Sequence, residues 1–217
     1  MAETLPERDD PGMIRTSRLL VAGALALGGL VAASHALAQG FYIGASAGSS
    51  SFDNDIAYGL ITSGSVDKSS SGYKLYVGYE FNQYFGLEVA YVDLGKAGYS
   101  GSYFGAPVTG GTVEVWGLNL SAVGTLPLNS TFAVFGKVGL FGWEAKSKDT
   151  TGGVPFSDVV SGADFSFGAG LRVRVYKNLS AHVEWERFGL TGYDYGYDHG
   201  YDLGNADLLS VGLAYRF

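Results

Sequence analysis

The chain has 217 residues, of which 34 are glycine and none is cysteine, and only 16% are charged. Soluble domains average about 7% glycine and about 25% charged residues, so this composition is not that of an ordinary soluble enzyme. The net charge of −7 argues against nucleic acid as a partner, because phosphate binding requires a basic surface. The lack of cysteine excludes disulfide frameworks, thiolate zinc sites and thiol nucleophiles.

The first predicted element is a secretory signal peptide over residues 1–38. An apolar run over 19–33 follows two arginines and precedes the small residues that a signal peptidase cleaves after. The run is shorter than the ~20 residues that a membrane-spanning helix needs. The segment before Met13 is acidic, which does not suit the positive start of a signal peptide, so Met13 is the better candidate for the true start. The mature domain is then expected over 39–217.

The mature chain shows apolar residues at every second position and no helical periodicity, which predicts an all-β fold. In chain order, the expected strands cover 40–49, 71–81, 84–95, 112–126, 131–144, 164–175, 179–188 and 206–217. One face of these segments is apolar, whereas the other face is small, polar or charged. The charged positions on that second face are Lys74, Glu80, Glu88, Lys137, Arg172, Arg174, His182, Glu184 and Glu186.

Three features favour an outer-membrane barrel, with the apolar face toward lipid, over a soluble sandwich. The segments are about 10 to 12 residues long, which suits a tilted membrane strand. Aromatic residues such as Tyr84, Trp116 and Phe188 cluster at segment ends, as interfacial girdles require. Short connections at 82–83, 127–130 and 176–178 alternate with long ones at 50–70, 96–111, 145–163 and 189–205. We therefore predict an eight-stranded antiparallel transmembrane up-and-down β-barrel in the outer membrane, with both termini periplasmic and the long loops extracellular.

The sequence resembles the transmembrane domain of the OmpA family. The resemblance is carried by YFGLEVAYVDLG at 84–95, by the segments 118–148 and 165–188, and by the terminal LLSVGLAYRF. It implies an outer-membrane anchor that supports envelope integrity and allows weak porin-like passage of small solutes, without a cofactor. It also implies that Tyr215 and Phe217 form the signal read by the outer-membrane assembly machinery. Many members continue into a peptidoglycan-binding domain, which we do not expect here because the sequence stops at Phe217.

The inward charges are the candidate site. Ions inside a narrow barrel are costly unless they are paired, so we expect Glu88 and Glu184 to pair with Lys137 and Arg172. The resemblance implies that Glu88 matches a glutamate that exchanges basic partners as a gate, although the matching basic positions are His182 and Val123 here. A static ion-paired plug is the interpretation we favour. A gate at His182 is the alternative, and it predicts conductance that changes between about pH 5 and 8.

An enzyme is not expected. Ser180, His182 and Glu184 would be the only candidates for a hydrolase, but residues two apart on a strand lie ~6.6 Å apart, beyond hydrogen-bond reach. All three also occupy strand positions that face the lumen rather than lipid.

The last long loop repeats tyrosine before aspartate three times, at Tyr193, Asp194, Tyr197, Asp198, Tyr201 and Asp202. A solvated loop is the simplest interpretation. A divalent-cation site formed by the three carboxylates with His199, or an adhesive surface for a host or neighbouring cell, are the alternatives. The adhesive alternative would make the chain an adhesin or opacity-type surface protein. The expected partners are outer-membrane lipid and lipopolysaccharide, the assembly machinery and, through this loop, another cell surface.

Overall fold

The computed structural model describes residues 40–53, 61–193 and 200–217, and Gly40–Phe217 form one compact unit. The predicted signal peptide and the proposed start at Met13 lie outside the described residues. No helix in the described ranges is long and apolar enough to cross a membrane.

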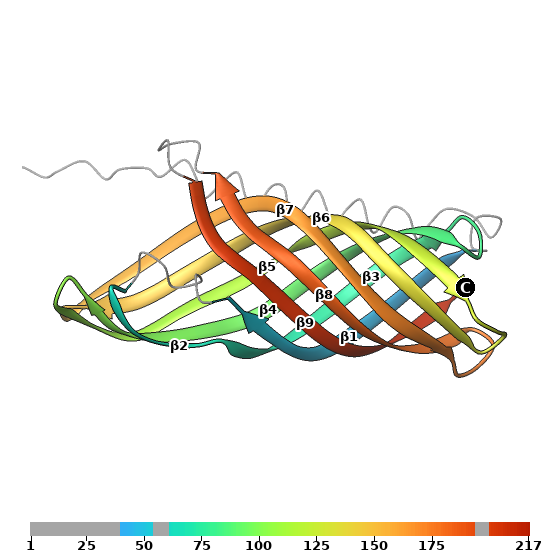
Figure 1. Cartoon of the computed structure of the whole chain (residues 1–217), viewed down its shortest axis with the longest axis horizontal. Coiled ribbons are helices and arrows are strands. Elements are labelled where there is room, and N and C mark those ends of the chain that lie inside the picture. The colour runs from blue at the N-terminus through green and yellow to red at the C-terminus, as the bar shows by residue number, and fades with distance from the viewer. Residues whose placement is uncertain (1–39, 54–60, 194–199) are drawn as a thin grey trace, which may run out of the picture. The chain divides into compact units, whose positions relative to one another are not determined.

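The described residues form a single antiparallel sheet that closes on itself, which confirms the prediction of an all-β antiparallel barrel (Figure 1). The neighbours around the ring are β1, β3, β4, β5, β6, β7, β8 and β9, and β9 pairs with β1 to complete it. A ninth strand, β2, is separated from β3 by Lys68 alone and pairs with β4 beyond the end of β3. The strands are β1 Phe41–Phe52, β2 Ser63–Asp67, β3 Ser69–Glu80, β4 Phe85–Tyr103, β5 Ala106–Pro127, β6 Phe132–Thr151, β7 Val154–Arg174, β8 Leu179–Tyr193 and β9 Gly200–Arg216.

The connections differ at the two ends of the barrel. At one end, which we call the short-turn end, the connections cover 81–84, 128–131 and 175–178. Asn82 and Asn129 each accept backbone N–H groups through the side-chain oxygen, which fixes two of these turns. Both ends of the described chain lie here too, because the Phe217 N–H donates to the Phe41 carbonyl at 3.0 Å.

The expected long loops are mostly strand, which corrects the sequence prediction. Residues 96–103 extend β4, 106–111 extend β5, 145–151 extend β6 and 154–163 extend β7. Glycine and serine in these segments suggested loops, but cross-strand pairing holds them in the sheet up to turns at 104–105 and 152–153. β5 has 22 residues, about twice the 9–11 that a membrane strand requires, so the β4–β5 and β6–β7 hairpins extend well past β8 and β9 (Figure 1).

The two faces of the sheet have inverted polarity. Large apolar side chains point outward, including Leu75 at 55% exposure, Val138 at 64% and Phe165 at 73%. Lys74 and Glu184, by contrast, face inward at 1% exposure. A soluble protein does not leave so extended an apolar surface in water, so the outward face is built for contact with lipid.

The lumen is filled in layers along the barrel. Charged side chains occupy the middle, on the inward positions of β3, β4, β6 and β8. Further along β4, β6 and β8, and on β9, the inward residues away from the short-turn end are apolar and fully buried: Leu94, Phe141, Phe188, Leu190 and Leu208. The sequence pattern predicts small, polar or charged side chains on the inward face, so this apolar layer is a correction. An eight-stranded barrel leaves only enough room for such side chains to fill it.

Candidate functional site

A chain of ion pairs crosses the middle of the lumen. Lys74 Nζ lies 2.6 Å from Glu184 Oε2 and 2.7 Å from Glu186 Oε2. Lys137 Nζ lies 2.7 Å from both Glu184 Oε1 and Glu88 Oε1. Glu184 therefore bridges the two lysines through its two oxygens. We call these five residues the central ion network.

Neutral side chains satisfy the remaining carboxylate oxygens of the central ion network. Tyr42 donates its hydroxyl to Glu88 Oε2 at 2.9 Å. Asn119 donates its amide to Glu186 Oε1 at 2.8 Å and accepts the hydroxyl of Ser166 at 2.8 Å. A buried charge is tolerated only when such partners replace water, so the network is built to be stable in one arrangement.

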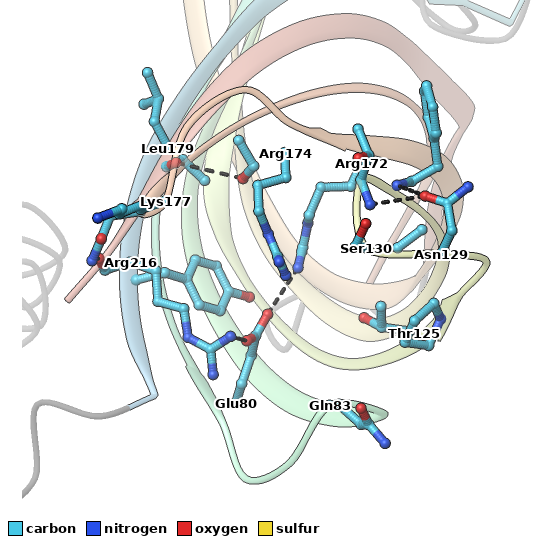
Figure 2. A pocket seen from close by; sticks show the side chains of 18 residues that line it. Glu80, Gln83, Thr125, Asn129, Ser130, Arg172, Arg174, Lys177, Leu179 and Arg216 are labelled. Atoms are coloured by element: carbon cyan, nitrogen blue, oxygen red, sulfur yellow. Dashed lines mark hydrogen bonds and ion pairs between the residues drawn. The ribbon is translucent and has the colours of Figure 1, made fainter.

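Arg172 does not join the central ion network, which corrects its expected pairing with Glu88 or Glu184. Its guanidinium instead contacts Glu80 Oε1 at 2.8 Å, and Arg216 contacts the other oxygen of Glu80 at 2.9 Å. Figure 2 shows this arrangement at the short-turn end. The reason is register: Arg172 pairs across the sheet with His182, closer to this end than Glu184.

His182 also lies apart from the carboxylates. Its Nδ1 is 3.5 Å from the Tyr76 hydroxyl, and its ring packs edge-on against Tyr76 with centroids 5.8 Å apart. Within the described part of the chain, no ion pair includes His182. The cation opposite Glu88 is Lys137, on a strand that the family pattern did not single out.

The apolar layer forms a second obstruction in the lumen. The rings of Phe141 and Phe188 pack with centroids 4.7 Å apart, and both side chains are fully buried. Phe188 was expected in the interfacial girdle, but it shares the inward parity of Glu184 and Glu186 on β8. We call Phe141 and Phe188 the aromatic plug.

Two inward tyrosines lie over glycines of the neighbouring strand. Tyr42 pairs with Gly78, and Tyr76 pairs with Gly44. A Cβ on Gly78 would overlap the Tyr42 ring, and one on Gly44 would overlap the Tyr76 ring. Neither tyrosine stands out in the sequence as a site residue, although Tyr76 lies two positions from Lys74 and so on the same face of β3.

The hairpin extension contains its own buried contact. Tyr99 donates its hydroxyl to Asp149 Oδ2 at 2.8 Å, and the tyrosine ring is buried. Burial and the neighbouring Asp149 carboxylate both raise the pKa of the Tyr99 hydroxyl. This contact ties β4 to β6 beyond the membrane band.

The remaining candidate residues fall into two groups. Tyr215 and Phe217 are exposed, with ring centroids 5.3 Å apart, at the outward edge of the last strand. In the last loop, backbone pairing joins Tyr193 with Gly200 and Gly192 with Tyr201, and Asp202 pairs with Thr191. Asp194, Tyr197, Asp198 and His199 lie outside the described residues.

The described residues form neither the considered hydrolase site nor a metal site. Ser180 Oγ is 3.5 Å from the Ala214 carbonyl, His182 contacts Tyr76, and Glu184 is held by two lysines. The three side chains of the considered hydrolase site thus have separate partners. The described ranges contain no group of three His, Cys, Asp or Glu residues able to hold a metal ion.

Solved structures with similar folds are outer-membrane barrels. The Neisserial surface protein A matches with a TM-score of 0.52 and 14% identity, covering 82% of this chain and 97% of that one. OprG from Pseudomonas aeruginosa matches with a TM-score of 0.51 and 10% identity, covering 82% and 97%. Ail, the attachment invasion locus protein of Yersinia pestis, matches with a TM-score of 0.50 and 19% identity, covering 82% and 99%. These likenesses establish the fold alone.

Proteins with similar sequences identify the family as well as the fold. Outer membrane protein A of Serratia marcescens is 28% identical over 206 residues, covering 91% of this chain and 55% of the relative. The protein of the same name from Salmonella typhi is 27% identical over 200 residues, covering 91% and 54%. The chain thus spans about half the length of these relatives. The family model described as the OmpA-like transmembrane domain matches residues 36–217. The chain belongs to the OmpA-like transmembrane domain family and is an outer-membrane β-barrel protein.

Proposed function

We propose that the protein is a structural component of the outer membrane that supports envelope integrity and allows only weak passage of small solutes. The observation that carries this proposal is the filled lumen inside a lipid-facing barrel. In the proposed orientation, both termini and the short turns face the periplasm, and the long hairpins face outward. Lipid and lipopolysaccharide surround the barrel, and Tyr215 and Phe217 serve as the signal for the assembly machinery.

Two obstructions in series support weak rather than open passage. The central ion network fills the middle of the lumen, and the aromatic plug fills the next layer. Lys137 already contacts two carboxylates, Glu88 and Glu184, at equal distances of 2.7 Å. Any opening at this layer has to separate Lys137 from one of these buried carboxylates, which is costly, so the gate hypothesis moves from His182 to Lys137.

Single-channel recording of the purified protein in a planar bilayer tests this function. We expect brief, small openings from the wild type, because both layers must rearrange. The double variant Phe141→Ala, Phe188→Ala should open more often or more widely, whereas the outward control Phe167→Ala should not. Substitution of His182 by alanine should leave the pH profile of conductance unchanged. A steady large conductance in the wild type would contradict the filled lumen.

Adhesion is the second candidate function, and an open strand edge favours it. Residues 154–163 of β7 pair with β6 on one side, while pairing with β8 begins only at Ser166. This edge carries the exposed apolar side chains Val154, Phe156 and Val159, at 51–57% exposure. An extended segment of a partner protein can add to such an edge by backbone hydrogen bonds.

Cell adherence assays separate the two functions. The triple variant Val154→Lys, Phe156→Lys, Val159→Lys should abolish adherence if the edge is the contact, while resistance of the cells to detergent stays normal. Deletion of residues 192–204 tests the last loop in the same assay. The matched control, Ser65→Lys, places a charge on the exposed β2 strand. Full adherence of both the triple variant and the deletion would reject the adhesive function.

A further inference from the structure

A cavity of about 300 Å³ opens at the short-turn end of the barrel, next to the central ion network but separate from it. Its charged lining consists of Glu80, Arg172, Arg174, Lys177 and Arg216, which come from β3, β7, the β7–β8 turn and β9. Figure 2 shows the side chains of Arg172 and Arg174 pointing into this cavity above Glu80. We call it the basic cup.

The charges of the basic cup are not balanced. Four cationic side chains line the cup, and Glu80 is the only carboxylate among its described lining residues. Both oxygens of Glu80 are already used, one by Arg172 at 2.8 Å and one by Arg216 at 2.9 Å. Arg174 and Lys177 have no ion-pair partner among the residues that the structure describes. The cup therefore holds an excess of positive charge.

The geometry of the basic cup favours an anionic ligand over solvent alone. Arg172 is held between the rings of Tyr42 and Phe135, with its Cζ 5.8 Å and 5.4 Å from the two centroids. Stacking of this kind fixes a guanidinium in place, so less side-chain freedom is lost when an anion binds. Asn129 uses its amide oxygen to accept two backbone N–H groups, which leaves its NH₂ group available as a further donor.

We propose that the basic cup binds a phosphate group. Guanidinium groups match the oxygens of phosphate by paired hydrogen bonds, and an ammonium group such as that of Lys177 adds a further charge. Inorganic phosphate, with about −1.5 to −2 charges, offsets about half of the excess or more, which a single carboxylate would not. The phosphate can come from a soluble anion, or from a phospholipid headgroup at the rim, whose diester carries a single charge but offers guanidinium groups the same paired oxygens. The site does not depend on whether the lumen conducts.

Calorimetric titration with inorganic phosphate tests the site in full-length protein held in an uncharged maltoside detergent. We expect saturable binding to the wild type and at least tenfold weaker binding to Arg174→Gln, Lys177→Gln. Both side chains are exposed and lack ion partners, so the variant should keep its fold, which circular dichroism checks. The matched control Lys146→Gln, Lys148→Gln removes two cations from the opposite end and should bind as the wild type does.

A second arm identifies the source of the phosphate. The same titration is repeated in nanodiscs of phosphatidylglycerol. Retained binding indicates a soluble phosphate as the ligand, whereas binding that disappears only in the nanodiscs indicates that lipid headgroups occupy the cup. Absence of binding in detergent, equal binding by the Arg174→Gln, Lys177→Gln variant, or equally tight binding of acetate would each overturn the proposal.

Discussion

At the scale of single residues, Glu184 holds the central ion network together because its two oxygens contact different lysines. Loss of its charge removes one of the two carboxylate contacts of Lys74 and of Lys137, which keep Glu186 and Glu88, in a site with 1–5% exposure. Breaking a buried pair by removing one partner typically costs about 3–5 kcal/mol, because the other charge stays buried.

Glu184→Gln should therefore lower the free energy of unfolding by at most about 3–5 kcal/mol, because each lysine keeps a second carboxylate. Urea titration of the refolded protein in lipid vesicles, followed by tryptophan fluorescence, measures this change. The control Glu114→Gln removes one partner of the exposed Lys96–Glu114 pair and should change stability by about 1 kcal/mol or less. Equal effects of the two variants would show that the network contributes no more than a surface pair.

Glycines that face tyrosine rings form a second constraint at this scale. Gly44→Ala should destabilise the barrel by about 1–3 kcal/mol, because the new methyl group overlaps the Tyr76 ring and also meets the Leu213 carbonyl in a packed lumen. Gly124→Ala is the matched control, since a Cβ there meets no atom within 4 Å. The same urea titration compares the two. A Gly44→Ala variant as stable as Gly124→Ala would mean that the tyrosine moves without cost.

At the scale of elements, the strand partners of β7 change along its length. Over 166–174 it lies between β6 and β8, whereas over 154–163 it pairs with β6 alone. In an antiparallel strand, alternate residues direct their N–H groups to opposite neighbours. Every second amide of the outer part therefore has no partner among the strands that the structure describes.

Amide hydrogen exchange measured by NMR in micelles should show this difference. We expect alternating fast and slow exchange over 154–163, and uniform protection over 166–174. β5, which has partners on both sides along most of its length, is the internal control. Uniform protection of 154–163 would reveal that something already covers the edge.

The sequence predicts the strand type, the ring of strands and the inward orientation of Lys74, Glu88 and Glu184, because these depend on the simple alternation of residues along each strand. It did not predict that Arg172 pairs with Glu80. That choice depends on how far neighbouring strands are staggered, which alternation alone does not reveal. It also interpreted 96–111 and 145–163 as loops, because the pairing that extends a Ser- and Gly-rich hairpin comes from its neighbours.

At the scale of the whole molecule, the two ends of the barrel differ in how far their hairpins extend and in the charge they carry. The short-turn end carries the basic cup, and the opposite end carries the hairpin extension. The proposed orientation places the first in the periplasm and the second outside the cell. Because the chain has no cysteine, single cysteines report on this orientation without background.

Ser102→Cys, on the hairpin extension, should react with a membrane-impermeant maleimide in intact cells. Asn178→Cys, in the β7–β8 turn, should react only after the outer membrane is permeabilised. Gel-shift detection of the labelled protein measures both. The reverse pattern would place the basic cup on the outside and invert the proposed topology.

The central ion network has a consequence for how the barrel assembles. Lys74 comes from the second strand of the ring and its partners Glu184 and Glu186 from the seventh, so these charges meet only when the first and last strands have been brought together. A partly closed barrel would expose unpaired ions to a lipid-lined interior, at a cost of several kcal/mol each. Intermediates of insertion are thereby disfavoured, and closure becomes an all-or-none event.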